Sequence, residues 1–285
     1  MKWDEMRQSQ NVEDVRGSRR VGGGTVAGGL GLGGIIIAVI ASLLFGLDPS
    51  QVIGTMSGGA PAQQQGQSAP INDQDAAFVR AVLGDTEDVW NSVFQKQVGQ
   101  AYRAPKLVLF SGATPGACGT AQTAAGPFYC PVDEKIYLDM AFFQAISAAA
   151  GPDADFARAY AISHEVGHHI QNVLGIMGQV QDLQRRSDEV TGNALSVRLE
   201  LQADCFAGVW GNSTAKRGYV SNTDLTAALN TASQIGDDYL QKRSRGYSSP
   251  ETWTHGSSAQ RVKWYKQGLS TGDIRQCDTF SVQNP

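Results

Sequence analysis

The sequence has few cysteines and no large excess of either charge. Its four cysteines include no C-x-x-C pair, which argues against a cysteine-ligated structural zinc site and against a thioredoxin-like redox motif. Its 23 basic and 27 acidic residues leave a formal net charge of -4, so a nucleic-acid partner is not expected. At 285 residues, the chain is long enough for one sizeable domain with appendages.

Charge is missing altogether from residues 21–47, whose centre is strongly apolar. About 20 such residues span a bilayer as a helix. Basic residues precede this stretch, and none follows it before Arg80. The positive-inside rule therefore predicts that residues 1–20 form a disordered cytoplasmic tail and that the rest lies outside the cytoplasmic membrane, in the periplasm or extracellular space. Residues 48–70, rich in Gly, Gln, Ser, Ala and Pro, are expected to be a flexible linker to a domain over residues 71–285.

A cleaved signal peptide is the alternative to this membrane anchor. The sequence A-P-A at residues 60–62 resembles a cleavage site, but the basic stretch and the apolar run before it are long for a signal peptide. If the segment is an anchor, Gly29 and Gly33 form a G-x-x-x-G pattern that could pair two membrane helices into a homo-oligomer.

The pattern H-E-x-x-H occurs as His164, Glu165 and His168. Apolar neighbours and a plausible N-cap, Asp153, predict that the motif lies on a helix. Residues four apart share one face of a helix, so both imidazoles can bind a single zinc ion. Glu165 is then placed to accept a proton from a zinc-bound water. The sequence therefore predicts a metal site that still needs its third protein ligand.

Two acidic residues on a second predicted helix supply candidates for that role. Glu200 could complete the zinc site, while Asp204, one turn further on, could accept the outer N–H of His164 and fix its tautomer. The alternative is a solvated acidic face. Leu201 and Phe206 lie among these carboxylates, however, and an unpaired charge in apolar surroundings would be costly.

The two motifs together resemble the gluzincin class of zinc peptidases. With the N-terminal apolar segment and a later T-H-G triplet at residues 254–256, the sequence resembles the bacterial neutral zinc metallopeptidase family over nearly its whole length. The resemblance implies Glu165 as the general base and three zinc ligands, His164, His168 and Glu200. The metzincin pattern fails, because positions 171 and 174 hold glutamine and leucine instead of glycine and histidine.

His255 and Arg261 keep the spacing of an H-P-x-x-x-x-R segment of some gluzincins, with glycine in place of the proline. This partial match makes His255 a candidate catalytic donor to the oxyanion of the transition state. The alternative is an ordinary loop or core histidine. Arg261 either orients a carboxylate or is a surface charge. His169 lies about 100° round the helix from His168 and is expected to be structural.

A small β-sheet is expected in the domain beside its helices. Residues 106–110 and 135–138 are predicted strands, and an edge strand could add a substrate peptide by main-chain hydrogen bonds. Two helices are expected to begin at Asp73 and at Asp85.

The cysteines suit disulfides in a domain outside the cytosol. Cys118 and Cys130 bound the loop between the two predicted strands and are expected to pair. Cys205 and Cys277 would then tie the C-terminal tail to the second motif helix, although four cysteines allow three connectivities.

The sequence thus predicts a helix-rich, zincin-like α+β metallopeptidase domain preceded by one transmembrane helix. Its expected function is that of a zinc-dependent metalloendopeptidase acting on a peptide or protein substrate. The alternative is a non-catalytic, membrane-tethered zinc-binding protein that recruits a partner. A structural zinc site would not need Glu165 and would usually be closed by a fourth protein ligand, so the enzyme is favoured.

Overall fold

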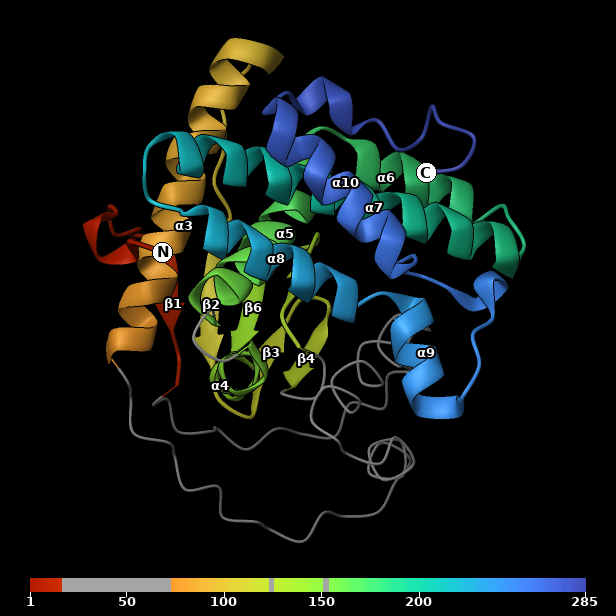
Figure 1. Cartoon of the computed structure of the whole chain (residues 1–285), viewed down its shortest axis with the longest axis horizontal. Coiled ribbons are helices and arrows are strands. Elements are labelled where there is room, and N and C mark those ends of the chain that lie inside the picture. The colour runs from red at the N-terminus through yellow and green to blue at the C-terminus, as the bar shows by residue number, and fades with distance from the viewer. Residues whose placement is uncertain (17–72, 123–125, 151–153) are drawn as a thin grey trace, which may run out of the picture.

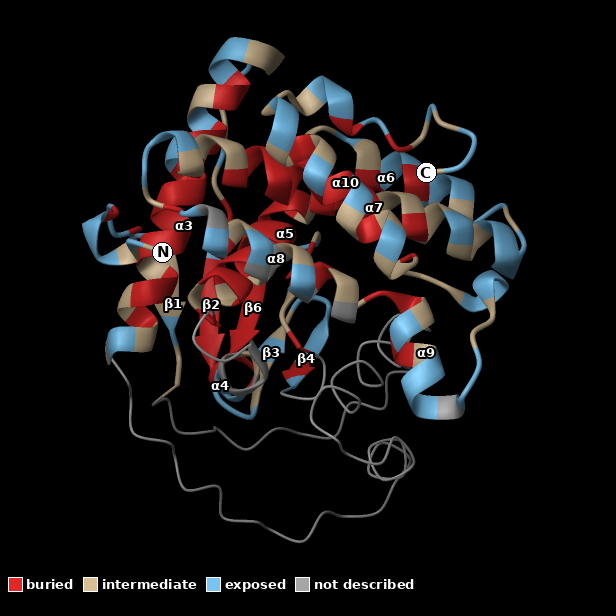
Figure 2. Ribbon diagram, viewed as in Figure 1, coloured by how far each residue is buried: buried red, intermediate tan, exposed pale blue. Residues whose placement is uncertain are grey.

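The computed structural model describes residues 1–16, 73–122, 126–150 and 154–285 (Figure 1). The described chain is a helix-rich α+β fold, as predicted. A small mixed sheet lies towards the side where the chain begins, α7 and α10 lie on the other side of α5, and α8 runs across α5 from near α3 (Figure 1). Buried residues concentrate in the two central strands and in α5, which together form the middle of the core (Figure 2).

The main sheet has four strands in the order β1-β2-β6-β5. Its first three strands are parallel, and β5 pairs with β6 in the antiparallel direction. The predicted strands at 106–110 and 135–138 are confirmed as the two central strands. The four strands are β1 (Val12–Asp14), β2 (Lys106–Phe110), β5 (Phe128–Cys130) and β6 (Lys135–Asp139). A separate hairpin joins β3 (Ala113–Gly116) to β4 (Gly119–Gln122).

Eight α-helices account for most of the described chain. Their bounds are α3 (Asp73–Val93), α4 (Met140–Ala150), α5 (Ala154–Val173), α6 (Ile176–Gln184), α7 (Glu189–Lys216), α8 (Asn222–Gln234), α9 (Asp237–Arg245) and α10 (Ser258–Thr271). The prediction that a second helix begins at Asp85 is wrong, because α3 runs through this residue. The buried Asp85 carboxylate instead accepts hydrogen bonds from Trp210 and Thr214 of α7.

Small residues let α7 pack closely against its two neighbours. At Gly167 of α5, an added Cβ would lie 2.9 Å from the carbonyl oxygen of Ala203. At Gly268 of α10, an added Cβ would lie 1.9 Å from the carbonyl oxygen of Cys205. Backbones can approach this closely only where a side chain is missing. The long helix α7 is thereby fixed between α5 and α10, which carry the other residues of the site.

The N-terminal residues differ from expectation. Residues 1–16 are an ordered part of the domain, because β1 adds a strand to the sheet and Met6 is only 6% exposed. The prediction of a disordered tail is therefore wrong for these residues. It failed because a three-residue strand leaves almost no periodicity in the sequence.

Within the described ranges, no helix combines the length and hydropathy needed to cross a membrane. The expected transmembrane helix at 21–47, its G-x-x-x-G pattern, the linker at 48–70 and the A-P-A sequence at 60–62 lie outside the described residues.

Candidate metal centre

Helix α5 presents the H-E-x-x-H residues on the side that faces α7. His164 and Glu165 are buried, with 7% and 8% of their surfaces exposed. One turn separates His164 from His168, so their imidazoles lie side by side with ring centroids 4.8 Å apart. The N-cap expected for this helix, Asp153, is not among the described residues.

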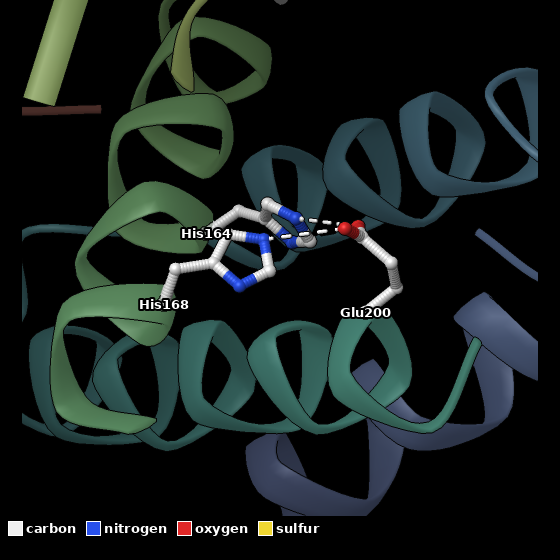
Figure 3. Close-up of side chains that lie close together, drawn as sticks. All are labelled: His164, His168 and Glu200. Carbon is white, nitrogen blue, oxygen red and sulfur yellow. Dashed lines mark hydrogen bonds and ion pairs between the residues drawn. The ribbon is translucent and has the colours of Figure 1, made fainter. Parts of the chain in front are cut away.

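Glu200 of α7 points at both imidazoles (Figure 3). Its Oε2 lies 3.1 Å from Nε2 of His164, and its Oε1 lies 3.4 Å from Nε2 of His168. One ligand atom from each of the three residues falls within 4.8 Å of the others. The structure therefore brings the three predicted ligands together from two helices.

The outer nitrogens of both imidazoles are already engaged. Nδ1 of His164 lies 2.9 Å from Oδ1 of Asp204, and Nδ1 of His168 lies 2.9 Å from Oε1 of Gln171. Because both partners are acceptors, each Nδ1 carries a proton in the metal-binding tautomer, and each Nε2 presents a lone pair. Two lone pairs and a carboxylate then face one another, which is unfavourable unless a cation lies between them. This donor set fits zinc.

Asp204 is the centre of a buried network behind His164. It is fully buried and accepts two hydrogen bonds from Arg261, Nε to Oδ2 at 2.8 Å and Nη2 to Oδ1 at 2.9 Å. The hydroxyl of Tyr160 also donates to Oδ1. Arg261 is 3% exposed, so it orients a carboxylate and is not a surface charge. The expected contact between Asp204 and His164 is present.

The charges of the site shift its pKa values in opposite directions. Burial would raise the pKa of Asp204, but the Arg261 guanidinium and His164 lower it to about 2. Burial would lower the pKa of His164, but Asp204 and Glu200 raise it to about 10. In the metal-free protein this imidazole therefore holds a proton that a bound metal would replace.

Glu165 has the electrostatics expected of a base. Its burial raises the pKa of the carboxyl, while the neighbouring imidazoles oppose that rise. The backbone of Tyr129 in β5 also lies close enough to this carboxyl to lower its pKa. A carboxylate with a raised pKa accepts a proton more readily than an exposed one. This proximity places the last strand of the described sheet beside the candidate metal ligands.

His255 lies in the turn before α10 and within electrostatic reach of Glu200, whose pKa it helps to lower. Its Nδ1 is 3.5 Å from Oδ1 of Asp237 and 3.0 Å from the hydroxyl of Thr254. The other oxygen of Asp237 accepts backbone N–H groups from Thr254, His255 and Gly256, at 2.8, 2.7 and 3.0 Å. Asp237 thus fixes the turn that carries His255.

Comparison with known proteins agrees with this geometry. Residues 1–280 match the model of a family described as "Putative neutral zinc metallopeptidase". The chain belongs to this zinc metallopeptidase family. It is 44% identical to "Uncharacterized protein YpfJ" of Escherichia coli K12 over 288 residues, which cover 98% of this chain and 99% of the relative. It is 39% identical to "Uncharacterized protein Rv2575" of Mycobacterium tuberculosis H37Rv over 260 residues, or 85% of each chain. No solved structure matched.

In this member of the zinc metallopeptidase family, the fourth histidine, His169, packs in the core as expected of a structural residue. His169 is fully buried, and its Nε2 donates to the carbonyl of Arg103 at 2.6 Å. Its Nδ1 lies 3.1 Å from the Tyr129 hydroxyl.

Both expected disulfides are formed. Cys118 pairs with Cys130 at the end of β5, and Cys205 pairs with Cys277. The second bond joins the C-terminal segment to α7 one residue beyond Asp204. The disulfides therefore brace two elements that carry residues of the site.

Three residues of the site were not predicted from the sequence: Tyr160, Gln171 and Asp237. Tyr160 and Gln171 lie on the motif helix, one turn before His164 and nearly one turn after His168, where outer contacts to the ligands can form. That spacing was the available signal for them. Asp237 had a weaker signal, an acidic residue directly after a glycine at the start of a helix.

Proposed function

We propose that this chain is a zinc-dependent metalloendopeptidase that hydrolyses peptide bonds in a peptide or protein substrate. The observation that carries the proposal is the pairing of three metal-binding side chains with a buried carboxylate, Glu165, next to two of them. A structural zinc site needs four protein ligands and no base, whereas three ligands and a base suit hydrolysis. A zinc ion held there would supply Lewis acidity to a substrate carbonyl and to water.

Within that mechanism each residue has a defined task. Glu165 takes a proton from the attacking water and passes it to the nitrogen of the leaving amine. His255 donates a hydrogen bond from Nε2 to the carbonyl oxygen as negative charge builds on it. The Thr254 hydroxyl, 3.0 Å from Nδ1, can donate to that nitrogen and so leave the proton on Nε2. Asp237 fixes the turn that carries the ring through the backbone N–H groups it accepts.

Strand β5 is the element best placed to hold the substrate backbone. It is an edge strand of the described sheet, and the backbone of its residue Tyr129 is near enough to Glu165 on α5 to lower the pKa of that carboxyl. A peptide that paired with β5 would bring its scissile bond towards Glu165. The disulfide from Cys130 to Cys118 keeps this strand in place.

The rival proposal is a zinc-binding protein whose cleft recruits a partner without catalysis. The two differ in whether the metal has an open position, which a peptide hydroxamate occupies and a fourth protein ligand would block. The test is titration of the zinc-loaded full-length protein with a peptide hydroxamate, beside a diverse peptide library analysed by mass spectrometry. Hydroxamate binding with cleavage supports the peptidase. Zinc binding without either response contradicts it and favours the recruiting protein.

A further inference from the structure

Residues 1–16 are joined to the domain through their backbone. The residues of β1 align with Leu107, Val108 and Leu109 of β2 in a parallel register. The pairing extends beyond the strand, because the N–H of Leu107 donates to the carbonyl of Asn11 at 2.8 Å. Before the strand, the N–H of Ser9 donates to the carbonyl of Arg80 in α3 at 2.9 Å. The segment is thus attached to both the sheet and a helix.

Helix α3 carries a glycine where the N-terminal segment crosses it. A Cβ added to Gly84 would lie 2.2 Å from the carbonyl oxygen of Arg7 and 3.1 Å from the nitrogen of Ser9. Glycine within a helix is destabilising relative to alanine. Its occurrence near the middle of a long helix is therefore explained by the close passage of residues 7–9.

A buried carboxylate on the same helix is matched to this segment. Glu87 is 6% exposed and accepts hydrogen bonds from three side chains of the N-terminal segment. The donors are Nη2 of Arg7 at 2.7 Å, Oγ of Ser9 at 2.5 Å and Nδ2 of Asn11 at 2.8 Å. A buried carboxylate is stable only where such donors meet it. A glycine, a carboxylate and a strand edge together form one docking surface for residues 1–16.

We propose that residues 1–16 belong to the metallopeptidase domain, to which they contribute its first strand, and lie in the same compartment as the rest of the domain. Neighbouring strands are about 4.8 Å apart, whereas the hydrocarbon core of a bilayer is about 30 Å thick. One sheet cannot be assembled from strands on opposite sides of that core. The predicted topology, with the N-terminus inside and the domain outside, is therefore incompatible with the pairing of β1 and β2.

The disulfides indicate which compartment the segment and the domain share. The domain contains two disulfides, and such bonds persist in oxidising compartments outside the cytosol. Residues 1–16 are consequently placed outside the cytosol with the domain. This inference does not depend on the proposed catalytic activity, because it rests on the sheet and the disulfides alone.

Two cysteine variants of the full-length protein test the shared compartment. Gln8→Cys and Gln181→Cys place thiols at exposed positions, the first in the N-terminal segment and the second in α6. Cells stripped of outer layers are treated with a thiol reagent that does not cross membranes, before and after lysis. We expect both variants to be labelled before lysis. Labelling of one before lysis and of the other only afterwards would overturn the proposal. Labelling of both only after lysis would keep the shared compartment and overturn its placement outside the cytosol.

A pair of glycine variants tests whether the segment is docked. Gly178→Ala in α6 adds a Cβ with nothing within 4 Å, so it should raise the melting temperature through improved helix propensity. Gly84→Ala improves the helix in the same way but pushes against the backbone of Arg7, so it should lower the melting temperature. A rise in both variants would mean that residues 7–9 do not cross α3, and the proposal would fail.

Discussion

Replacement of Arg261 by methionine tests whether the hydrogen-bonded network of Arg261, Asp204 and His164 stabilises the fold and the candidate metal centre. Arg261 and Asp204 are 3% and 0% exposed and share two hydrogen bonds of 2.8 and 2.9 Å. Methionine fills much of the same space but removes the charge and every donor. Loss of one partner from a buried ion pair costs about 3–5 kcal/mol, because the other charge stays buried and uncompensated.

The same change should weaken metal binding. Asp204 orients the imidazole of His164 through Nδ1, and loss of such an outer contact reduces metal affinity by about 10–100-fold. Arg261→Met acts one step further out, because it frees Asp204 to move or to take up a proton. We therefore expect zinc affinity to fall towards the lower end of that range.

Denaturant unfolding of the metal-free protein measures the stability change, and competition with a chromophoric chelator measures zinc affinity. The matched control is Arg275→Met, which removes an exposed pair with Asp273 and should leave both quantities unchanged. In a double-mutant cycle, Arg261→Met should cost much less in an Asp204→Asn background. A loss of less than about 1 kcal/mol for Arg261→Met, as for a surface pair, with unchanged zinc affinity would refute the reasoning.

Three further predictions follow from the same site. Glu200→Ala removes the carboxylate between the imidazoles, so zinc content measured after dialysis should fall sharply; retention of full zinc would exclude Glu200 as a ligand. His255→Ala should lower kcat by about 100–1,000-fold with zinc content unchanged; an unchanged kcat would remove His255 from catalysis. Burial would raise the pKa of Asp237, but His255 and backbone N–H groups lower it below its ordinary value. The contribution of Asp237 to stability is therefore complete above the ordinary pKa and is lost as pH falls through the lowered pKa. Asp237→Asn should therefore flatten the acid limb of melting temperature against pH, and an unaltered limb would contradict the assignment.

Helical spacing is the reason that the sequence alone indicates which side chains meet at the candidate metal centre. His164 and His168 are four residues apart on one helix, and so are Glu200 and Asp204 on the next. Once both segments are helical, each pair must share a face. What remained was whether the two faces meet, and the apolar and small residues around them favoured that outcome.

Contacts between distant segments were beyond this reasoning. The weak signal for Asp237 was outweighed, because apolar residues from Leu225 to Tyr239 recur at helical spacing across Gly236, which predicts one uninterrupted helix. The helix is interrupted there because Gly236 is extended, with φ -73° and ψ 145°. Position 236 must be glycine, since an added Cβ would lie 2.1 Å from the backbone nitrogen of Ser258. The interruption makes Asp237 the first residue of α9 and turns its carboxylate towards His255.

The N-terminal strand was missed for a related reason. Its three residues pair with β2 about 95 positions along the chain, and a short edge strand has too few residues to show alternation. The predicted helix start at Asp85 was wrong because an acidic residue in the middle of a helix resembles an N-cap in the sequence. Its role is to accept hydrogen bonds from α7.

The most direct test of the account compares turnover and zinc content in the wild type and in Glu165→Gln. Glutamine keeps the shape of Glu165 but cannot take a proton, and Glu165 is not one of the three residues that could hold a metal ion. We expect equal zinc content in both proteins and cleavage of peptides by the wild type alone. Equal cleavage by the two proteins would contradict Glu165 as the base, and absence of cleavage by the zinc-loaded wild type across a diverse peptide library would contradict the peptidase itself.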